Sequence, residues 1–519
     1  MIFRCPAPDI RIPNASLTEH ILEHVAARAS KPAVIDGITG QTITYAELDD
    51  MSARAAAELI RAGLRPGDVV ALISLNQPLY VVACYAIMRA GAVFTPINPL
   101  LAAAEINKQL SDSAATTVIN TTNIDAKVTE AATGTAVRWR YALDGTGAGS
   151  LAALATARQG ALPVTDPSSL AALPYSSGTT GTSKGVMLSH RNLVASLEQH
   201  RAFWNVSDSD VLCASVPMFH VYGFNVVMNS AVLAGATLVT LPRFDLRTYL
   251  GLVEKFRITR GHFAPPILLA LAQAPYVDQC DLTSMYLAIS GAAPLDERTA
   301  VRVAERTGIR VVQGYGMTEA SPGTHAVGDD DVDVPIASVG KLLPCTEARI
   351  VDPATNRDAD LGEPGELWIR GPQVMQGYLR QPEATAHTVT EGWLHTGDLV
   401  QIRDGNFYVI DRLKELIKYS GFQVAPAELE ALLLTHPHVL DAAVIGVTHP
   451  TAGEAPKAYV VPNGSVDAAE LLAWTAARVA SYKKIREIEF VEEIPKSPTG
   501  KILRRVLKEA ALQHKEATS

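Results

Sequence analysis

Cysteine, positive charge and long apolar runs are all in short supply in this chain. Its 519 residues include five cysteines, which are scattered and form no CxxC pair. An odd number of isolated cysteines argues against a disulfide framework and against a zinc site. The formal net charge is −9, so no general attraction to nucleic acid or to anionic lipid is expected.

No sequence feature directs the chain to secretion or to a membrane. The opening MIFRCPAPDIRIP mixes prolines with charges and lacks the apolar core of a signal peptide. The longest apolar run, Pro78 to Met88, is closed by Arg89 and is too short to span a bilayer. The last residues are not a peroxisomal signal of the S-K-L type. We therefore expect a soluble cytoplasmic protein with no nucleic-acid partner and no integral membrane association.

The composition and the apolar pattern predict a globular α/β fold. Hydrophobic residues make up 48% of the chain and charged residues 19%. Thr44 and Glu47 have the spacing of a capping box and predict a helix that continues to about Arg61. Apolar runs at Val69–Leu75 and Ala92–Ile97 alternate with helical patterns. This alternation predicts a sheet of parallel strands covered by helices.

The pattern changes after about Ile336 and again near Asp411. Short alternating segments separated by Pro, Gly and Asp-Gly turns predict a small antiparallel or barrel-like subdomain over about 336–410. A helix beginning at Pro426 then opens the last unit. We therefore predict a large N-terminal domain, 1–411, of helix-covered sheets plus the β-rich subdomain, and a small α+β C-terminal domain, 412–519.

The stretch YSSGTTGTSKG, residues 175–185, is suited to binding phosphate. Its glycines let the backbone approach a ligand, and its hydroxyls and lysine are donors for phosphate oxygens. A Walker A loop does not fit, because Lys184 is followed by glycine. A flexible Ser/Gly linker is the alternative, but a predicted strand on each side favours a nucleotide loop. The expected ligands are Ser176, Ser177, Gly178, Thr179, Thr180, Gly181, Thr182 and Lys184.

The same stretch resembles the phosphate-loop signature of the adenylate-forming superfamily, which contains acyl-CoA synthetases, peptide synthetase adenylation domains and beetle luciferases. Further motifs that resemble the family follow in family order: GYGMTE at 314–319, WLHTGD at 393–398, DRLKELIK at 411–418 and PTGK at 498–501. The segment KYSGFQVAPAE, at 418–428, is most similar to 4-coumarate–CoA ligases. The resemblance covers nearly all of the chain after Tyr175.

The resemblance implies a reaction in two half-steps. A carboxylate attacks the α-phosphate of ATP, pyrophosphate leaves, and the thiol of coenzyme A then displaces AMP from the acyl adenylate. Both steps build negative charge that fixed cations and donors stabilise, with Mg²⁺ as the metal. In the family the small domain is a mobile lid that swings between the half-steps, so 1–411 becomes the adenylation domain and 412–519 the lid.

The resemblance also assigns roles to charged residues that would otherwise be read as solvated or ion-paired. Lys501 would bridge the carboxylate and the α-phosphate, and Glu319 would bind magnesium. Asp398 would hold the ribose hydroxyls, and Arg412 would contact ribose and phosphate. The remaining nucleotide positions implied by the family are Gln313, Gly314, Tyr315, Gly316 and Thr318.

The resemblance also implies residues for the hinge, for the thiol chemistry and for the binding of the acid. Lys414 falls at the hinge, Lys418 and Gln423 near the adenylate and the thioester chemistry, and Ser420 and Gly421 along the path of CoA. His220 resembles a histidine that gates the acyl pocket, although a lone histidine is often a hydrogen-bonded core residue. The acyl-pocket positions are Tyr222, Gly291, Gly316, Pro322 and Gly323.

The chain departs from the common plant ligases at two of these positions. Gly323 stands where they usually carry valine, and Ser420 where they usually carry lysine. We expect the glycine to widen the pocket floor for larger acids. The change at Ser420 leaves part of the CoA contact open.

Several functions remain compatible with the sequence. An ATP-dependent ligase of hydroxycinnamate-like or other aromatic acids to CoA leads, and a fatty-acyl ligase is an alternative. An adenylating enzyme that passes the acyl group to a carrier protein or an amine is another, although only Ile502 to Ser519 follow Lys501, too few for a fused carrier. A nucleotide-binding sensor would be expected to lose Lys501, Glu319 or Asp398, all of which are kept. The acid and the oligomeric state stay open.

Overall fold

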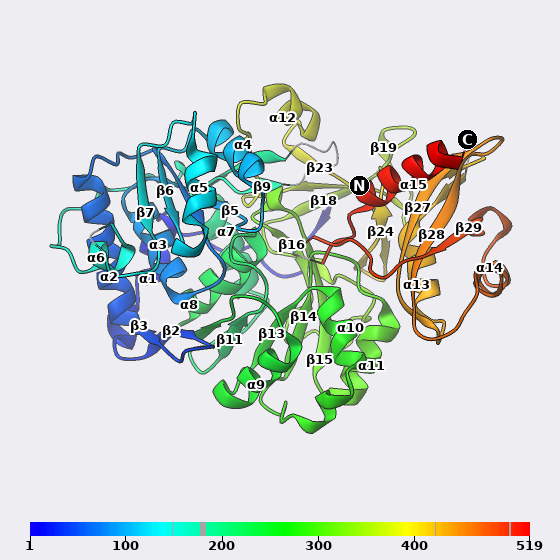
Figure 1. Cartoon of the computed structure of the whole chain (residues 1–519), viewed down its shortest axis with the longest axis horizontal. Coiled ribbons are helices and arrows are strands. Elements are labelled where there is room, and N and C mark those ends of the chain that lie inside the picture. The colour runs from blue at the N-terminus through cyan, green and yellow to red at the C-terminus, as the bar shows by residue number, and fades with distance from the viewer. Residues whose placement is uncertain (148, 177–182, 421, 498–499, 519) are drawn as a thin grey trace.

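The computed structural model describes the chain except residues 148, 177–182, 421, 498–499 and 519. Within this described part, three sheets build the large N-terminal portion, and a further sheet forms a smaller unit at one end of the molecule (Figure 1). The α/β fold class with a large and a small domain is therefore confirmed. None of the described helices is long and apolar enough to cross a membrane.

The first sheet arises from the alternating apolar runs of the N-terminal third. β4, β5, β6 and β7 pair in parallel, because a helix crosses over between successive strands. The predicted helix is confirmed as α2 (Tyr45–Arg61), which begins with a capping box between Thr44 and Glu47. The strand order is β21 (Gly377–Tyr378), β10 (Lys184–Ser189), β8 (Leu170–Ala172), β5 (Val93–Ile97), β4 (Val69–Ile73), β6 (Thr117–Asn120), β7 (Trp139–Ala142), with β9 (Tyr175–Ser176) on β10. Its helices are α3 (Pro78–Arg89), α4 (Ala103–Ser113), α5 (Asp125–Ala132) and α6 (Leu151–Ala155).

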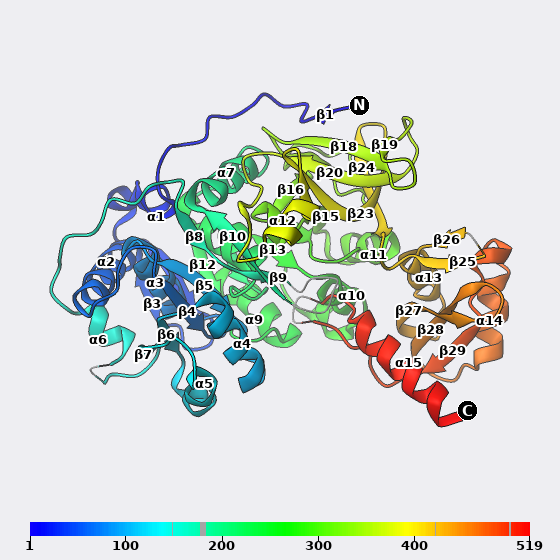
Figure 2. The same cartoon turned by 90° about the horizontal axis from the view of Figure 1, so that it is seen from above.

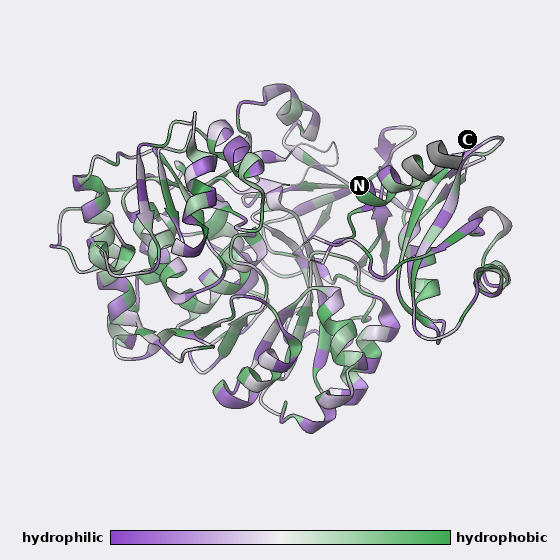
Figure 3. Ribbon diagram, viewed as in Figure 1, coloured by the Kyte–Doolittle hydropathy of each residue, from purple (hydrophilic) through white to green (hydrophobic). Residues whose placement is uncertain are grey.

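The second sheet is parallel at its centre and antiparallel at both edges. Its order is β17 (Lys341–Leu342), β16 (Gly323–Ala326), β15 (Arg310–Gly316), β14 (Leu287–Ser290), β13 (Arg260–Phe263), β11 (Val211–Ala214), β12 (Thr237–Thr240), β2 (Pro32–Asp36), β3 (Thr42–Thr44). One hydrophobic core joins it to the helices α9 (Leu246–Phe256), α10 (Pro265–Gln273) and α11 (Glu297–Thr307). Hydrophilic residues colour the outer side of helices such as α9 (Figure 3).

A second core joins the two large sheets to each other. It contains residues of α3, of both sheets, and of α1 (Leu17–Leu22), α7 (His190–Arg201), the π-helix η3 (Tyr222–Asn229) and α8 (Ser230–Ala234). Ten of the twelve residues of α7 are buried, which is typical of a helix enclosed on all sides. α7 and η3 are therefore internal elements, and their side chains face the interior of the large domain.

The third sheet is antiparallel, as the short alternating segments predict. Its order is β1 (Phe3–Arg4), β18 (Glu347–Asp352), β20 (Gly365–Arg370), β23 (Trp393–Arg403), β22 (Val389–Thr390), with β19 (Arg357–Asp358) on β18 and β24 (Asn406–Arg412) on β23. β1 joins it from the opposite end of the sequence, because Phe3 pairs with Ala348. The β-rich subdomain therefore includes N-terminal residues that the local sequence pattern did not indicate.

The C-terminal unit has a hydrophobic core of its own. The predicted helix is confirmed as α13 (Pro426–Leu433), which buries Leu429 and Leu433 in that core. The other elements are β25 (Ile417–Tyr419), β26 (Phe422–Val424), β27 (Val439–His449), β28 (Gly453–Pro462), α14 (Ala468–Ala476), β29 (Glu487–Phe490) and α15 (Arg504–Thr518). Between β29 and α15 the chain runs back toward α10 of the large domain (Figure 2). This excursion carries Lys501.

Candidate active site

The carboxyl ends of β13, β14 and β15 meet at one edge of the second sheet, since the three strands pair in parallel. Ala264, Gly291 and Gly316 lie at these ends. Ligands of open α/β sheets bind outside the carboxyl ends of the strands. The third sheet and the Lys501 segment approach the same edge, so residues from four regions of the sequence can converge there.

Asp398 is the buried acid of this convergence, with 5% of its surface exposed. The Tyr315 hydroxyl, from β15, donates to Asp398 Oδ2 at 2.5 Å. Arg412, the β24 residue paired with Asp398 in the ladder, places its Nε 3.3 Å from Oδ1. Burial raises the pKa of Asp398, while Arg412, the Tyr315 hydroxyl and Lys501 oppose the rise. Asp398 is thus a buried carboxyl beside Arg412 and Lys501, and in its ionised form it can accept hydrogen bonds from hydroxyl groups.

Lys501 faces the same cluster from the small domain. Burial, with the positive charge of Arg412, lowers the pKa of Lys501 to about 8, against the opposing attraction of Glu415 and Asp398. The preceding Gly500 is seated on the start of α10, where an added Cβ would lie 2.9 Å from Cδ of Pro266. Gly500 also has a positive φ of 78°. The structure therefore has the domain orientation in which Lys501 enters the large domain, a choice that the sequence left open.

Glu319 is a second buried carboxylate at this edge. It lies in the short helix η5 (Thr318–Ala320), in which Thr318 is also buried, and its Oε1 accepts from the Tyr378 hydroxyl at 2.9 Å. The Lys184 ammonium lies 4.7 Å from the centre of the Tyr378 ring. Among the described residues, no group of three His, Cys, Asp or Glu side chains could hold a metal. A lone carboxylate fits Mg²⁺, which is commonly bound by one or two carboxylates together with substrate phosphates.

The phosphate loop joins two paired strands, as the sequence predicts. Lys184 of β10 pairs with Ser176 of β9, and the Ser176 hydroxyl is buried without a partner among the described residues. The loop residues between them, Ser177, Gly178, Thr179, Thr180, Gly181 and Thr182, lie outside the described residues, as does Gly421. The end of the loop thus places Lys184 beside Tyr378, whose hydroxyl bonds to Glu319.

Gly316 and Pro322 form a close backbone contact after β15. Met317 N–H donates to the Pro322 carbonyl at 2.9 Å, and an added Cβ at Gly316 would lie only 2.1 Å from that oxygen. Gly314 pairs with Ala326, and Gly316 with Gly323. Only glycine at 316 permits this contact, so the residue is required by the backbone.

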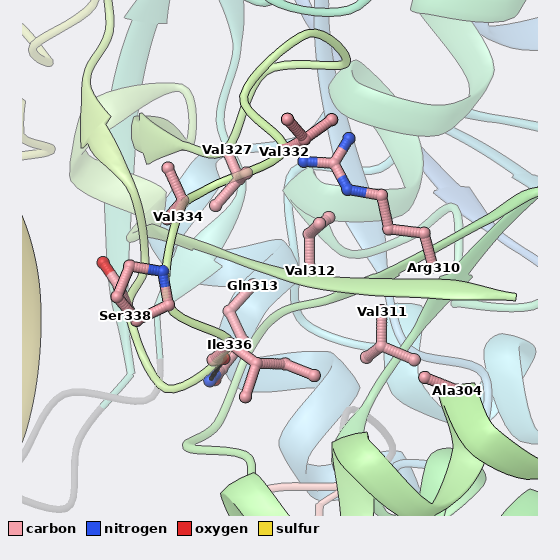
Figure 4. A pocket seen from close by; sticks show the side chains of 11 residues that line it. Ala304, Arg310, Val311, Val312, Gln313, Val327, Val332, Val334, Ile336 and Ser338 are labelled. Carbon is pink, nitrogen blue, oxygen red and sulfur yellow. Dashed lines mark hydrogen bonds between the residues drawn. The ribbon is translucent and has the colours of Figure 1, made fainter.

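Gln313 is one of the residues expected to contact the nucleotide, but in the structure its side chain bonds to other parts of the protein. Its side chain accepts from Leu295 N–H at 3.3 Å and donates to the Ile336 carbonyl at 2.9 Å. Any contact between residue 313 and the nucleotide would therefore be made by main-chain atoms. Gln313 also lines a cavity of about 240 Å³ between α11, β15 and the loop before β17 (Figure 4). Of the expected site residues that the structure describes, no other lines that cavity, so it is separate from the convergence described above.

Tyr222 and Gly291 meet as the acyl-pocket expectation requires. The Tyr222 ring lies where a side chain at 291 would be, since an added Cβ there would be 3.3 Å from the ring. Tyr222 begins the π-helix η3, a type of helix often found at functional sites. Just before it, His220 Nδ1 accepts from Tyr222 N–H at 3.3 Å, and burial lowers the pKa of His220 to about 4. The neutral imidazole therefore carries its proton on Nε2.

The expectation of an open pocket floor at Gly323 is wrong. An added Cβ at Gly323 would lie 2.2 Å from both Cε1 and Nε2 of His200, and 3.3 Å from Leu343. The imidazole of His200 therefore already fills the space that the missing side chain leaves. Two elements far apart in sequence, α7 and β16, share this space.

Models of two families match the chain. The AMP-binding enzyme model matches residues 21–379, and the AMP-binding enzyme C-terminal domain matches residues 428–501. The chain belongs to the AMP-binding enzyme family. A 4-coumarate–CoA ligase 2 of Nicotiana tabacum is 40% identical over 98% of this chain and 97% of its own length.

Solved structures of AMP-binding enzymes have the same fold. ATP-bound MatB from Rhodopseudomonas palustris matches with a TM-score of 0.89 and 32% identity, covering 96% of this chain and 99% of that one. The anthranilate CoA ligase AuaEII in complex with anthranoyl-AMP matches with a TM-score of 0.89 and 25% identity, covering 97% and 98%. The likeness extends over both domains.

The hinge and CoA residues expected for an AMP-binding enzyme lie apart from the Lys501 centre in this orientation. Lys414 is exposed between β24 and β25. Lys418 pairs with Gln423 in the β25–β26 hairpin, and both are exposed. Ser420 lies at the hairpin turn with a φ of 48°. Figure 2 shows this hairpin well away from the segment that enters the large domain. In this orientation Lys418 and Gln423 therefore do not join the Lys501 centre.

Sequence reasoning missed Tyr378 and His200. Tyr378 reaches Glu319 from β21, which is separated from it by 59 residues, and His200 reaches Gly323 from α7. Neither lies in a recognisable motif. They are revealed only by the pairing of strand β21 with β10 and by the packing of helix α7 against strand β16.

Proposed function

We propose that this AMP-binding enzyme is an ATP-dependent carboxylic acid–CoA ligase that acts through an acyl adenylate. The observation that carries the proposal is the convergence of Asp398, Tyr315 and Arg412 with Lys501, which the small domain delivers. The preferred acids are proposed to be hydroxycinnamate-like or other aromatic acids, because the Nicotiana tabacum relative is named for 4-coumarate and covers nearly the whole chain.

Lys501 supplies the positive charge for adenylation. The attacking carboxylate and the α-phosphate are both anions, and their approach is unfavourable in a buried site. An ammonium between them offsets this repulsion, and a compact point charge can contact both at once. Asp398 accepts from the ribose hydroxyls, while Arg412 stays beside it and contacts ribose and phosphate. These contacts position the α-phosphate for attack by the acid.

The β- and γ-phosphates belong to the loop 177–182 with Ser176 and Lys184. Glu319 would hold Mg²⁺, which neutralises charge on the phosphate oxygens when bound. Thr318, Gly316 and the main chain of Gln313 and Gly314 would line the nucleotide on the β15 side. His220, neutral and protonated on Nε2, would donate toward the acid at the mouth of the acyl pocket.

Thioester formation requires the other domain orientation. We propose that residues 412–519 rotate as a lid about Lys414 against the adenylation domain 1–411, whose β-rich part spans about 336–410. The rotation would withdraw Lys501 and bring Lys418 and Gln423 to the adenylate. Ser420 and Gly421 would then line the path of CoA. A cytoplasmic location stays a prediction from the sequence.

The proposal is tested by product analysis. Purified protein is incubated with ATP, Mg²⁺, CoA and a panel of acids from 4-coumarate and benzoate to medium-chain fatty acids, and the products are identified by mass spectrometry. We expect an aromatic acyl-CoA together with AMP. In Lys501→Ala, adenylation should fall by at least about 100-fold. Arg505→Ala, an exposed change in the same segment, is the matched control.

Other outcomes would redirect the assignment. Fatty acyl-CoA alone would make the protein a fatty-acyl ligase, and acyl adenylate without thioester would point to a carrier-protein or amine acceptor. Binding of AMP without adenylate from any acid would leave a nucleotide sensor and would overturn the proposal.

A further inference from the structure

His200 lies against Gly323, one of the positions expected to line the acyl pocket. It is 4% exposed and lies near the end of α7, with the edge of its imidazole against the Cα of Gly323. Any side chain at 323 would take this place, so the glycine is what admits the imidazole. The pairing of Gly316 with Gly323 in the β15–β16 ladder fixes the strand that His200 touches.

The tautomer of His200 follows from one hydrogen bond. Its Nδ1 lies 2.6 Å from the Ser196 carbonyl, and a carbonyl can only accept. Nδ1 therefore carries the proton. Burial lowers the pKa of His200 to about 4, so the ring is neutral near pH 7. Nε2, one of the two ring atoms nearest Gly323, is consequently a bare hydrogen-bond acceptor.

Neighbouring rings connect His200 to the rest of the pocket. The Trp204 ring lies 4.9 Å from that of His200, and His262 lies 5.8 Å from both Trp204 and Tyr222. The wall that results is continuous and runs through Gly291, Tyr222, His262, Trp204, His200 and Gly323.

Two of the polar groups in this wall already have partners. The Tyr222 hydroxyl contacts the Ile289 carbonyl and His262 Nδ1, each at 3.3 Å, and Trp204 Nε1 donates to the Val327 carbonyl at 3.0 Å. Among the described residues, no hydrogen bond ends at His200 Nε2. It is therefore an acceptor available to a bound acid.

We propose that His200 is a specificity-determining residue that selects acids with a hydroxyl or amino donor on the ring, remote from the carboxylate. The proposal rests on the proposed function, since it concerns the acid that the ligase activates. A donor group would satisfy Nε2, whereas an unsubstituted acid would leave the buried nitrogen without a partner. A methoxy group offers no donor and would add its methyl to space that the imidazole fills.

The test compares kcat/KM for 4-hydroxycinnamate, cinnamate and 4-methoxycinnamate. The hydroxy acid should lead in the wild-type protein. His200→Met keeps a similar length without a good acceptor and should lower the hydroxy-to-unsubstituted ratio about five-fold, because the hydroxy acid loses its acceptor while cinnamate no longer leaves a nitrogen unpaired and does not slow. His200→Gln, which retains an acceptor, should restore the ratio. Turnover of cinnamate is the internal control, because a general defect would lower it equally.

Gly323→Ala approaches the same contact from the other side and serves if His200→Met does not fold. Its Cβ should displace the imidazole and lower the same ratio. A ratio unchanged in His200→Met or Gly323→Ala overturns the role of His200 while the ligase assignment stands. If the wild-type protein activates no aromatic acid, the ligase assignment fails on aromatic acids and the role of His200 fails with it.

Discussion

At the scale of single residues, the site depends on charged groups whose neighbours come from other elements. From its neighbours in the sequence alone, Lys501 would be an ordinary solvated lysine in a Pro/Gly turn. Its position in the large domain instead partly buries it, and this burial, together with the charge of Arg412, lowers its pKa to about 8 against the opposing charges of Glu415 and Asp398. His220, with a pKa lowered to about 4 by burial, does not titrate near neutral pH. The pH response of adenylation should therefore come from Lys501.

We expect kcat/KM of the adenylation half-reaction to fall as the pH rises through about 8, because the free enzyme then loses the Lys501 ammonium. The decline in kcat should begin at higher pH, since bound anions favour the charged form. Pyrophosphate exchange measured from pH 6.5 to 9.5 checks both. The unfolded chain holds this proton more tightly, so its loss does not weaken the fold and the decline is not unfolding. A flat profile to pH 9.5 would refute the assignment.

At the scale of elements, a local sequence signal is enough to predict a helix that is not enclosed by the rest of the protein. The capping box that opens α2 satisfies backbone donors with Thr44 and Glu47. α7 instead depends on its surroundings, because almost all of it is buried. A local signal therefore accounts for the first turn of α2, whereas packing against the rest of the large domain decides the place of α7.

Thr44→Ala should lower the free energy of unfolding by about 1 kcal/mol, since the first turn of α2 loses its side-chain acceptor. Urea unfolding followed by circular dichroism measures the loss. KM values for ATP and acid should stay unchanged, because α2 lies away from the strand ends that build the site. Thr39→Ala, an exposed change in the preceding turn, is the control. A loss of stability equal in both variants would contradict the cap as its cause.

At the scale of the whole molecule, two domains share one active site. The small domain has a core of its own, yet under the proposed function Lys501 acts when Gly500 is seated on Ala264 and Pro266. In the proposed function this contact belongs to the adenylation orientation. A substitution that disrupts this contact should slow adenylation much more than thioester formation.

Gly500→Ala should slow adenylation about ten-fold or more, because the added Cβ meets Pro266 and the residue has a positive φ. Transfer of a synthetic acyl adenylate to CoA should change far less, since that step uses the other orientation. Pyrophosphate exchange and single-turnover transfer measure the two steps. Gly464→Ala is the matched control, with a similar φ of 97° and an added Cβ that, among the described residues, would meet only His438 of the small domain. Equal slowing of both steps would refute the role of this contact.

The sequence by itself determined what depends on neighbours along the chain. The capped helix α2, the parallel strands, the strands on both sides of the phosphate loop and the helix at Pro426 all follow from local spacing and period. The motifs around Glu319, Asp398 and Lys501 were likewise visible, because each is a short run whose chemistry is local.

Only the tertiary structure decided which of these residues meet. The segment that carries Lys501 enters the large domain near Asp398, whereas Lys418 and Gln423 lie away from it. The small domain can present only one of these faces to the large domain at a time. Tyr378 and His200 join the site through strand and helix packing that no local pattern encodes. The space beside Gly323 is filled by α7, and a glycine in the sequence cannot show what lies against it. Side-chain period and turn chemistry are local properties, whereas occupancy of space is a property of the folded whole.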